Sequence, residues 1–133
     1  MRRLVAILIL AATLAACAGD STVPRATIEL TAADSGSAVP AKVGDRIVIS
    51  LDANPTTGYT WQQVPGLDTS VVSYVSEDYE QAPAASPVVG GGGTDTWTFQ
   101  AVGEGTTTIA LGYQRSGDTT AAESFTVTVT VSQ

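Results

Sequence analysis

The chain has 133 residues, a formal net charge of −7 and no histidine. Its single cysteine is Cys17, so neither a Cys/His or Ser/His catalytic pair nor a zinc site of histidine and cysteine ligands can form. The acidic balance also argues against binding to nucleic acid and against electrostatic attachment to anionic lipid.

The N-terminal segment has the layout of an export signal. Met1-Arg2-Arg3 precedes an apolar run over residues 4–14 that is too short to span a membrane. The following Leu14-Ala15-Ala16-Cys17 resembles the lipobox of bacterial lipoproteins. This resemblance implies a signal peptide that ends at Ala16 and a lipid-modified, acylated Cys17, which attaches the protein to a bacterial membrane on its extracytoplasmic side, in the cell envelope. An ordinary secretion signal with an incidental cysteine is the alternative.

Removal of residues 1–16 leaves 117 residues, enough for one domain. It removes two of the six basic residues and none of the thirteen acidic ones, so the net charge of the remaining chain is −9. Residues 17–25 are then a lipidated N-terminus with a short polar tether, and residues 26–133 are a single domain.

Apolar and polar residues alternate with a period of two along this domain, which predicts β-strands throughout. A first strand around Ile28 and Leu30 precedes a turn at residues 34–37 and a short extended segment around Val39. The next strand places three apolar residues on one face, namely Ile47, Ile49 and Leu51.

Further strands follow a loop at residues 54–58. Tyr59 and Trp61 begin one strand, Val71 to Tyr79 forms another, and an irregular connection over residues 81–89 leads to the glycine run at 90–93. The last three strands alternate clearly, and residues 114–122 form a polar loop between the final two. Their expected inward residues are Trp97, Phe99, Ala101, Thr107, Ile109, Leu111, Tyr113, Phe125, Val127, Val129 and Val131.

This pattern predicts an all-β fold, an immunoglobulin-like β-sandwich of about seven or eight strands. The disulfide of true immunoglobulin domains is absent, so burial of aliphatic and aromatic side chains must hold the two sheets together. The aromatic residues on alternating apolar faces are therefore assigned to the core rather than to ligand stacking; they are Trp61, Trp97, Phe99 and Phe125.

The segment Asn54-Pro55-Thr56-Thr57-Gly58-Tyr59 is more elaborate than a minimal turn between two strands. Pro55 fixes its own φ and favours an extended Asn54, while Gly58 can take the positive φ that reverses the chain. The two threonine hydroxyls then lie on a short, stiff loop. A loop braced at both ends loses little entropy when it docks, so this pattern favours a binding loop, although such a loop alone is more often only a connection.

Loops between alternate strand pairs of a sandwich gather at one end, so we expect three segments to share one edge. They are the loop Asn54 to Tyr59, the run Gly90-Gly91-Gly92-Gly93-Thr94, and Tyr113-x-Arg115 with the residues after it. In this order and at these separations the three segments resemble the chagasin family of cysteine peptidase inhibitors, and the resemblance covers residues 27–131.

The third segment departs from the family pattern. Members usually carry Arg-Pro followed by an aromatic residue, whereas this chain reads Arg115-Ser116-Gly117. Arg115 carries over, but the rigidity of proline and the packing surface of the aromatic ring do not. We expect this departure to affect affinity and target range more than the fold.

The resemblance implies a protein without catalytic residues or a cofactor, which acts as a monomer and reversibly blocks the active-site cleft of papain-like cysteine peptidases. Thr56 and Thr57 would cover the catalytic thiolate and imidazolium. The glycine loop would approach one wall of the cleft, and Arg115 would contact the other. The implied inhibitory residues are Asn54 to Tyr59, Gly90 to Thr94, and Arg115 to Gly117.

Two other interpretations remain open. A non-inhibitory interaction module of the envelope, with the same fold, is favoured by the incomplete third segment. Asp78 and Glu80 lie two residues apart in a predicted strand, roughly 7 Å, which is compatible with a pair of hydrolytic carboxylates. No nucleophile with a neighbouring base supports an enzyme, and the scattered Asp52, Asn54 and Asp95 lack a recognised calcium spacing.

Overall fold

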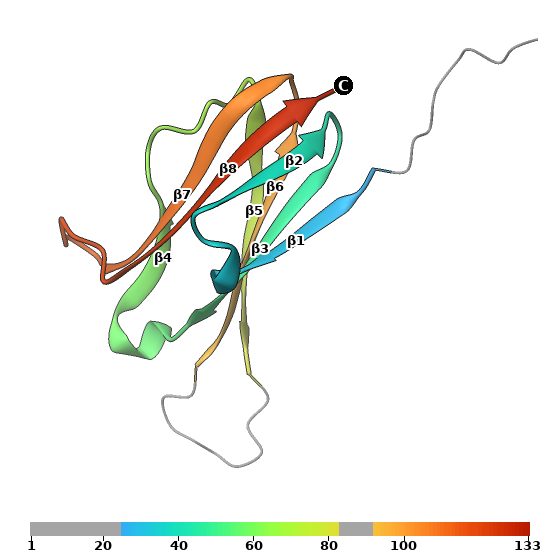
Figure 1. Ribbon diagram of the computed structural model, residues 1–133. Coiled ribbons are helices and arrows are strands. Elements are labelled where there is room, and N and C mark those ends of the chain that lie inside the picture. The colour runs from blue at the N-terminus through green and yellow to red at the C-terminus, as the bar shows by residue number, and fades with distance from the viewer. Residues whose placement is uncertain (1–24, 83–91) are drawn as a thin grey trace, which may run out of the picture.

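The structure is a computed structural model that describes residues 25–82 and 92–133 (Figure 1). The predicted signal peptide, Cys17, Gly90 and Gly91 lie outside the described residues. The described chain forms eight β-strands and two short 3-10 helices. In order they are β1 (Thr27–Thr31), η1 (Ala32–Asp34), β2 (Ser37–Lys42), β3 (Arg46–Ala53), η2 (Pro55–Thr57), β4 (Tyr59–Gln63), β5 (Val72–Gln81), β6 (Gly93–Ala101), β7 (Gly105–Arg115) and β8 (Glu123–Ser132).

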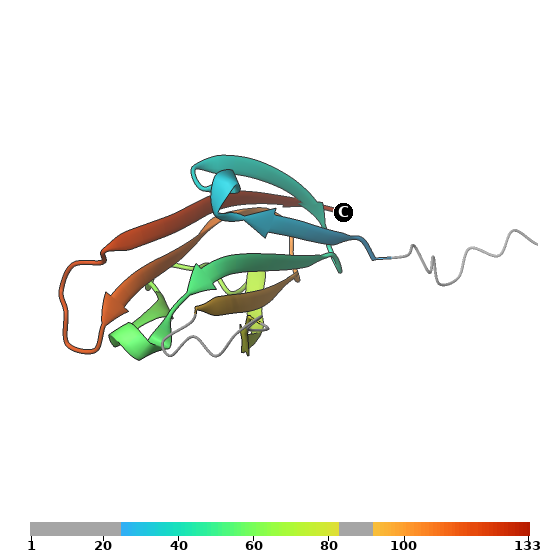
Figure 2. The same ribbon diagram turned by 90° about the horizontal axis from the view of Figure 1, so that it is seen from below.

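The strands form two four-stranded sheets, one in the order β1-β3-β6-β5 and the other in the order β2-β8-β7-β4. The β1–β3 and β2–β8 pairs are parallel, and all other pairs are antiparallel. Figure 2 shows the two sheets as separate layers, one containing β2 and β8 and the other β3 and β6. The prediction of an all-β, immunoglobulin-like sandwich of about seven or eight strands is confirmed.

The core lies between the layers and is built from the inward side of each alternating strand. All four aromatic residues assigned to it from the sequence are buried, and the most exposed of them, Trp61, keeps only 6% of its surface. Each fully buried large side chain contributes roughly 1.5–3 kcal/mol of transfer free energy. The buried apolar residues are Leu30, Ala41, Ile47, Ile49, Leu51, Ala53, Trp61, Val71, Val72, Trp97, Phe99, Ala101, Ile109, Leu111, Phe125, Val127, Val129 and Val131.

Two strands extend further than their sequence patterns indicate. β5 continues to Gln81, because its backbone still pairs with Gly93 of β6 at a position where the side chains no longer alternate. β7 continues to Arg115, which pairs with Tyr59 of β4, so the polar loop begins two residues later than expected. Both extensions occur at the same end of the sandwich.

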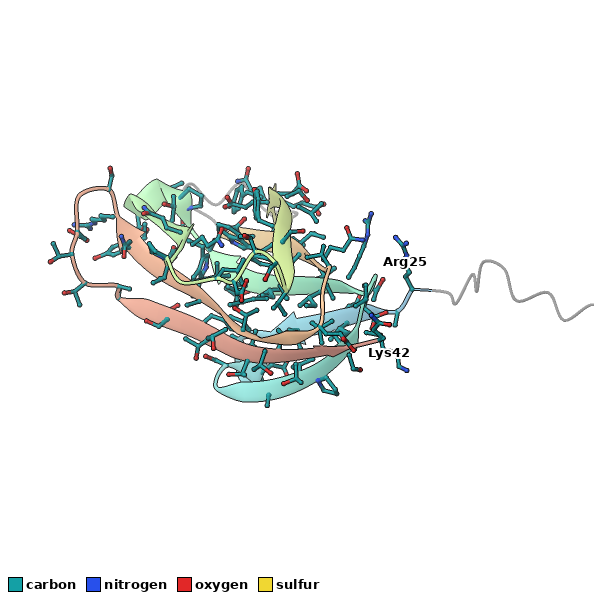
Figure 3. The ribbon with its side chains drawn as sticks, turned by 90° about the horizontal axis from the view of Figure 1, so that it is seen from above. Arg25 and Lys42 are labelled. Atoms are coloured by element: carbon teal, nitrogen blue, oxygen red, sulfur yellow. The ribbon has the colours of Figure 1, made fainter. Side chains whose placement is uncertain are left out.

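The two ends of the sandwich differ in what they carry. Thr27 pairs with Arg46 and Lys42 pairs with Ser132, so the beginning of β1 and the end of β8 lie at one end. Figure 3 shows Arg25 and Lys42 there. The opposite end holds the β3–β4 loop, the start of β6 and the β7–β8 loop. No helix within the described ranges is long and apolar enough to cross a membrane.

Candidate functional site

The three segments singled out in the sequence lie at this opposite end, which we call the binding edge (residues 54–59, 92–94 and 115–118). Strand pairing brings them together, since Ala53 pairs with Gly93 and Tyr59 with Arg115. A Cβ added to Gly92 would lie 3.1 Å from the carbonyl oxygen of Ala53. The expected common edge is thus formed by the described members of all three segments.

The first segment is a single turn of 3-10 helix, η2, with Asn54 at its N-cap position. The amide of Thr57 donates to the carbonyl of Asn54 (3.1 Å) and that of Gly58 to the carbonyl of Pro55 (3.0 Å). Gly58 ends the turn with a φ of 85°, in the left-handed region that glycine adopts without strain. Residues 55–58 are all exposed, and the backbone hydrogen bonds hold them in one turn. The segment therefore forms a stiff, protruding wedge.

Both threonine hydroxyls of this turn are directed back to Asn54. Thr57 Oγ1 donates to the Asn54 carbonyl at 2.7 Å, and Thr56 Oγ1 donates to Asn54 Oδ1 at 2.5 Å. Their protons are therefore used inside the loop, while lone pairs on the oxygens remain to accept hydrogen bonds from a partner. The two hydroxyl groups therefore stabilise the turn through Asn54, and their oxygens are still exposed to solvent.

Within the second segment, Gly93 lies so close to β5 that a side chain does not fit there. A Cβ on Gly93 would lie 2.2 Å from the carbonyl oxygen of Glu80 and 2.7 Å from the hydroxyl of Tyr79. The amide of Ala82 donates to the carbonyl of Gly92 at 3.2 Å, so β5 and β6 are still held together here. Thr94 follows as an exposed residue of β6.

A hollow of about 420 Å³ separates the first and second segments. Its lining combines residues of β3 and β6 with Tyr113 from the other sheet. It is lined by Asp52, Ala53, Asn54, Ala82, Gly92, Gly93, Thr94, Tyr113 and Glu123.

The third segment begins with Arg115, whose guanidinium carbon lies 4.6 Å from the centre of the Tyr59 ring. The amide of Arg115 donates to Asp118 Oδ2 (3.3 Å), and the amide of Asp118 donates to the Arg115 carbonyl (3.0 Å). Ser116 and Gly117 form the exposed tip, with Gly117 at a φ of 90°. The sequence analysis does not assign a role to Asp118, although aspartate beside glycine is a common turn signal.

Tyr113 is a second residue whose role the sequence pattern did not show. It was expected on the inward face of its strand, and it does pack against the core while remaining partly exposed. Its hydroxyl accepts a hydrogen bond from the amide of Asn54 at 2.8 Å. The available signal was its position two residues before Arg115, which places both side chains on one face of β7.

An acidic pair lies next to the second segment. Asp95 of β6 is only 3% exposed; its Oδ2 accepts a hydrogen bond from Trp97 Nε1 at 3.1 Å, and its Oδ1 is buried with no partner in the described geometry. Partial burial, followed by proton sharing with Asp95 and repulsion from Asp95 and Asp78, raises the pKa of Glu77 to about 7. The pair therefore holds a proton near neutral pH.

Neither a metal centre nor a catalytic carboxylate pair emerges from the described ranges. No group of three or more histidine, cysteine, aspartate or glutamate side chains there is placed to hold a metal ion. Asp78 and Glu80 are both exposed on the edge strand β5.

Comparison with known proteins gives consistent matches. Residues 40–131 match the model of the chagasin family peptidase inhibitors, I42. Chagasin of Trypanosoma cruzi is 31% identical over 102 residues, which cover 74% of this chain and 93% of that protein.

Two solved structures illustrate the shared fold. The cysteine protease inhibitor EhICP2 of Entamoeba histolytica superposes with a TM-score of 0.74 at 28% identity, covering 82% of this chain and 98% of that one. PbICP-C, solved in complex with falcipain-2, superposes with a TM-score of 0.56 at 18% identity, covering 81% of this chain and 92% of that one; at this identity the likeness concerns the fold alone. The family match spans more than half of the chain and agrees with the geometry of the binding edge, and the chain belongs to the chagasin family of peptidase inhibitors, I42.

Proposed function

We propose that the domain inhibits papain-like cysteine peptidases reversibly, by inserting the binding edge into the active-site cleft. The observation that carries this proposal is the common placement of the three loop segments at one end of the sandwich. Membership of a family of peptidase inhibitors, rather than of enzymes, supports it. So does the complex of the related fold PbICP-C with falcipain-2.

The first segment suits the centre of such a cleft. Reaction with a catalytic thiolate requires a carbonyl carbon at roughly 3–3.5 Å in an aligned geometry. The η2 turn offers the oxygens of Thr56 and Thr57 instead, and its backbone is folded on itself by the bonds to Asn54. The cleft is filled without a peptide bond in the position for attack, so the inhibitor is not cleaved.

The other two segments would contact the walls of the cleft. Without a side chain at Gly92, its backbone can approach a partner closely and pair with it as an extended strand. On the other side, Arg115 presents a cation on a fixed support, the ring of Tyr59. The partner class is therefore a peptidase whose cleft accepts an extended polypeptide and has polar or acidic groups on one wall.

Titration of the domain against papain and several cathepsins tests the proposal. We expect competitive, reversible inhibition, and the absence of inhibition at micromolar concentration across these enzymes would reject it. Thr57→Ala removes a brace of the wedge, and Gly92→Glu places a side chain against the carbonyl of Ala53. Both variants should weaken inhibition while their thermal unfolding stays close to that of the wild type.

We further propose export and lipid anchoring, with residues 1–16 removed as a signal peptide and Cys17 acylated in the envelope membrane. The amino-acid pattern of residues 1–17 supports this, as does the position of Arg25 at the end of the domain away from the binding edge. Mass spectrometry of the full chain expressed in a bacterium should show a diacylglyceryl group on residue 17. Cys17→Ser should release the protein from the membrane fraction; an unmodified Cys17 would contradict the proposal.

A further inference from the structure

One aromatic ring links the first and third segments of the binding edge. Tyr59 directly follows the η2 turn in the chain, and it pairs with Arg115 across the β4–β7 ladder. Its ring carries the Arg115 guanidinium on one side, 4.6 Å away, and stacks with Tyr113 at a centroid distance of 5.5 Å. Because directly opposed cross-strand residues share a face, this stacking follows from the register itself.

The ring of Tyr113 continues the contact back to the beginning of the first segment. It packs on Trp61, which is buried, at a centroid distance of 5.1 Å. Its hydroxyl takes the hydrogen bond of the Asn54 amide, 59 positions earlier in the chain, where the η2 turn begins. Tyr113 thus fixes both ends of the wedge. Its hydroxyl holds Asn54 at the beginning of the turn, and its ring stacks with Tyr59 at the end.

We propose that Tyr59 and Tyr113 are positioning residues that hold Arg115 and the η2 wedge in one fixed arrangement, so that the two segments enter a peptidase cleft as a rigid unit. This inference rests on the proposed inhibitory function. The third segment has no proline, and its tip contains Gly117. In this chain the support for Arg115 therefore comes from the neighbouring strand instead of from the loop's own residues.

The energetic reason is the conformational freedom of arginine. A long side chain that becomes ordered only on binding loses rotamer entropy at that moment, which lowers affinity. A guanidinium already stacked on a ring has lost part of that freedom in the free protein, and the planar group fits the ring face. Removal of the ring should consequently weaken inhibition even though no atom of Arg115 is changed.

A double-mutant cycle in the inhibition constant tests the coupling. Tyr59→Leu is expected to raise the inhibition constant about tenfold, as the loss of a cation–π contact would. In the Arg115→Ala background the same change should raise it by a clearly smaller factor, because only the η2 wedge, and no guanidinium, is left for the ring to position. Tyr59→Phe keeps the ring face and should restore values close to wild type.

Equal effects of Tyr59→Leu in both backgrounds would overturn the inference, since the ring would then act independently of Arg115. Tyr74→Leu is a matched control, because it removes an exposed tyrosine from β5 in the other sheet. It should leave the inhibition constant unchanged. Tyr113→Phe deletes only the acceptor of the Asn54 amide and should raise the inhibition constant about fivefold without a comparable loss in melting temperature.

Order parameters of the free protein test the same arrangement without any peptidase. Backbone amides of residues 56–58 and 115–118 should give values near 0.85 in the wild type and fall towards about 0.6 in Tyr59→Leu and Tyr113→Phe. Unchanged order parameters in both variants would overturn the inference even where inhibition is strong. If the wild type inhibits nothing but the order parameters fall as expected, the proposed function fails and the positioning role stands.

Discussion

Asp95 is an acid at an inward-facing position near the start of β6, where the alternating pattern continues with apolar residues. Trp97 and Phe99 occupy the next two inward positions, and Leu51 and Tyr79 pair with Asp95 from β3 and β5. A buried carboxylate is costly unless its charge is neutralised or hydrogen-bonded. The neighbouring Glu77, whose pKa is raised to about 7, can share its proton with Asp95, which lowers the cost of burying the Asp95 carboxyl group.

This pair predicts a pH dependence of stability with a definite sign. The pKa of Glu77 is raised from 4.5 to about 7, so between these values the folded chain holds a proton that the unfolded chain has lost. The free energy of unfolding should therefore fall as the pH rises from about 4.5 to about 7. Because Glu77 is exposed and screened by solvent, we expect a change of about 1 kcal/mol.

Urea denaturation at several pH values, followed by tryptophan fluorescence, measures this change. Trp97 donates to Asp95, so its emission should report the titration directly. Glu77→Gln should flatten the dependence over this window relative to the wild type. The same slope in wild type and Glu77→Gln would show that another group is responsible.

Two glycines with the same backbone angle allow conformational strain to be separated from a role in binding. Gly58 ends the η2 wedge and Gly36 lies in the turn before β2, and both have a φ of 85°. Substitution by alanine should cost each about 1–2 kcal/mol of stability, the penalty for an L-residue in the left-handed region. Only Gly58→Ala should also weaken inhibition; denaturation curves and inhibition constants of the two variants check this, and equal inhibition would contradict it.

At the scale of elements, the sandwich was predictable because strongly alternating strands bury one face. β8 illustrates this, since Phe125, Val127, Val129 and Val131 are all buried and separated by threonines. The parallel pairing of β1 with β3 and of β2 with β8 was not predictable, because alternation fixes which face is buried and says nothing about the neighbour of a strand. β5 was the strand hardest to predict, because it is an edge strand with a bulge and exposed acidic residues, and its apolar and polar residues do not alternate clearly.

The three loop segments of the candidate site could be predicted from the sequence, but the contacts that hold these segments in place could not. Pro55, Gly58 and Arg115 carry local signals that a sequence shows directly. The contact between Tyr113 and Asn54 joins residues 59 positions apart, and it depends on the register of β4 and β7, which side-chain periodicity does not specify. For the same reason the burial of Asp95 next to Glu77 was not expected.

The close approach of β5 and β6 at the binding edge predicts the effect of a methyl group there. Gly93→Ala would bring Cβ within 2.2 Å of the Glu80 carbonyl, and Gly103→Ala would bring Cβ within 2.3 Å of the Ser70 carbonyl at the other end of β6. Both should destabilise the fold to a similar degree, because backbone must move in each. Stopped-flow inhibition assays below the melting transition should show weaker inhibition for Gly93→Ala only.

At the scale of the whole molecule, both ends of the described chain leave the sandwich away from the binding edge. Lys42 of β2 pairs with Ser132 near the C-terminus, and Arg25 lies at the same end (Figure 3). Attachment through either terminus should therefore leave the loops accessible. We expect a domain immobilised through its N-terminus to inhibit within about twofold of the free domain.

The opposite orientation provides the control. Thr57→Cys, coupled to the same support through the new thiol, should lose nearly all of the inhibition that this variant shows free in solution, because the exposed wedge is then turned toward the support. Surface-based binding measurements on the two preparations compare them directly. Similar inhibition by both would mean that the partner binds elsewhere on the sandwich.

Because the tether and the loops lie at opposite ends of the sandwich, the length of the sandwich determines how far the loops stand from the point of attachment. β7 runs 11 residues from one end of the sandwich to the other, roughly 35 Å at the rise of an extended strand. An anchored copy, held by the lipid proposed for Cys17, would present its wedge about that far beyond the tether that joins the domain to the bilayer. It would intercept peptidases that diffuse through the surrounding fluid, whereas proteolysis taking place flush with the lipid headgroups would lie beneath its reach.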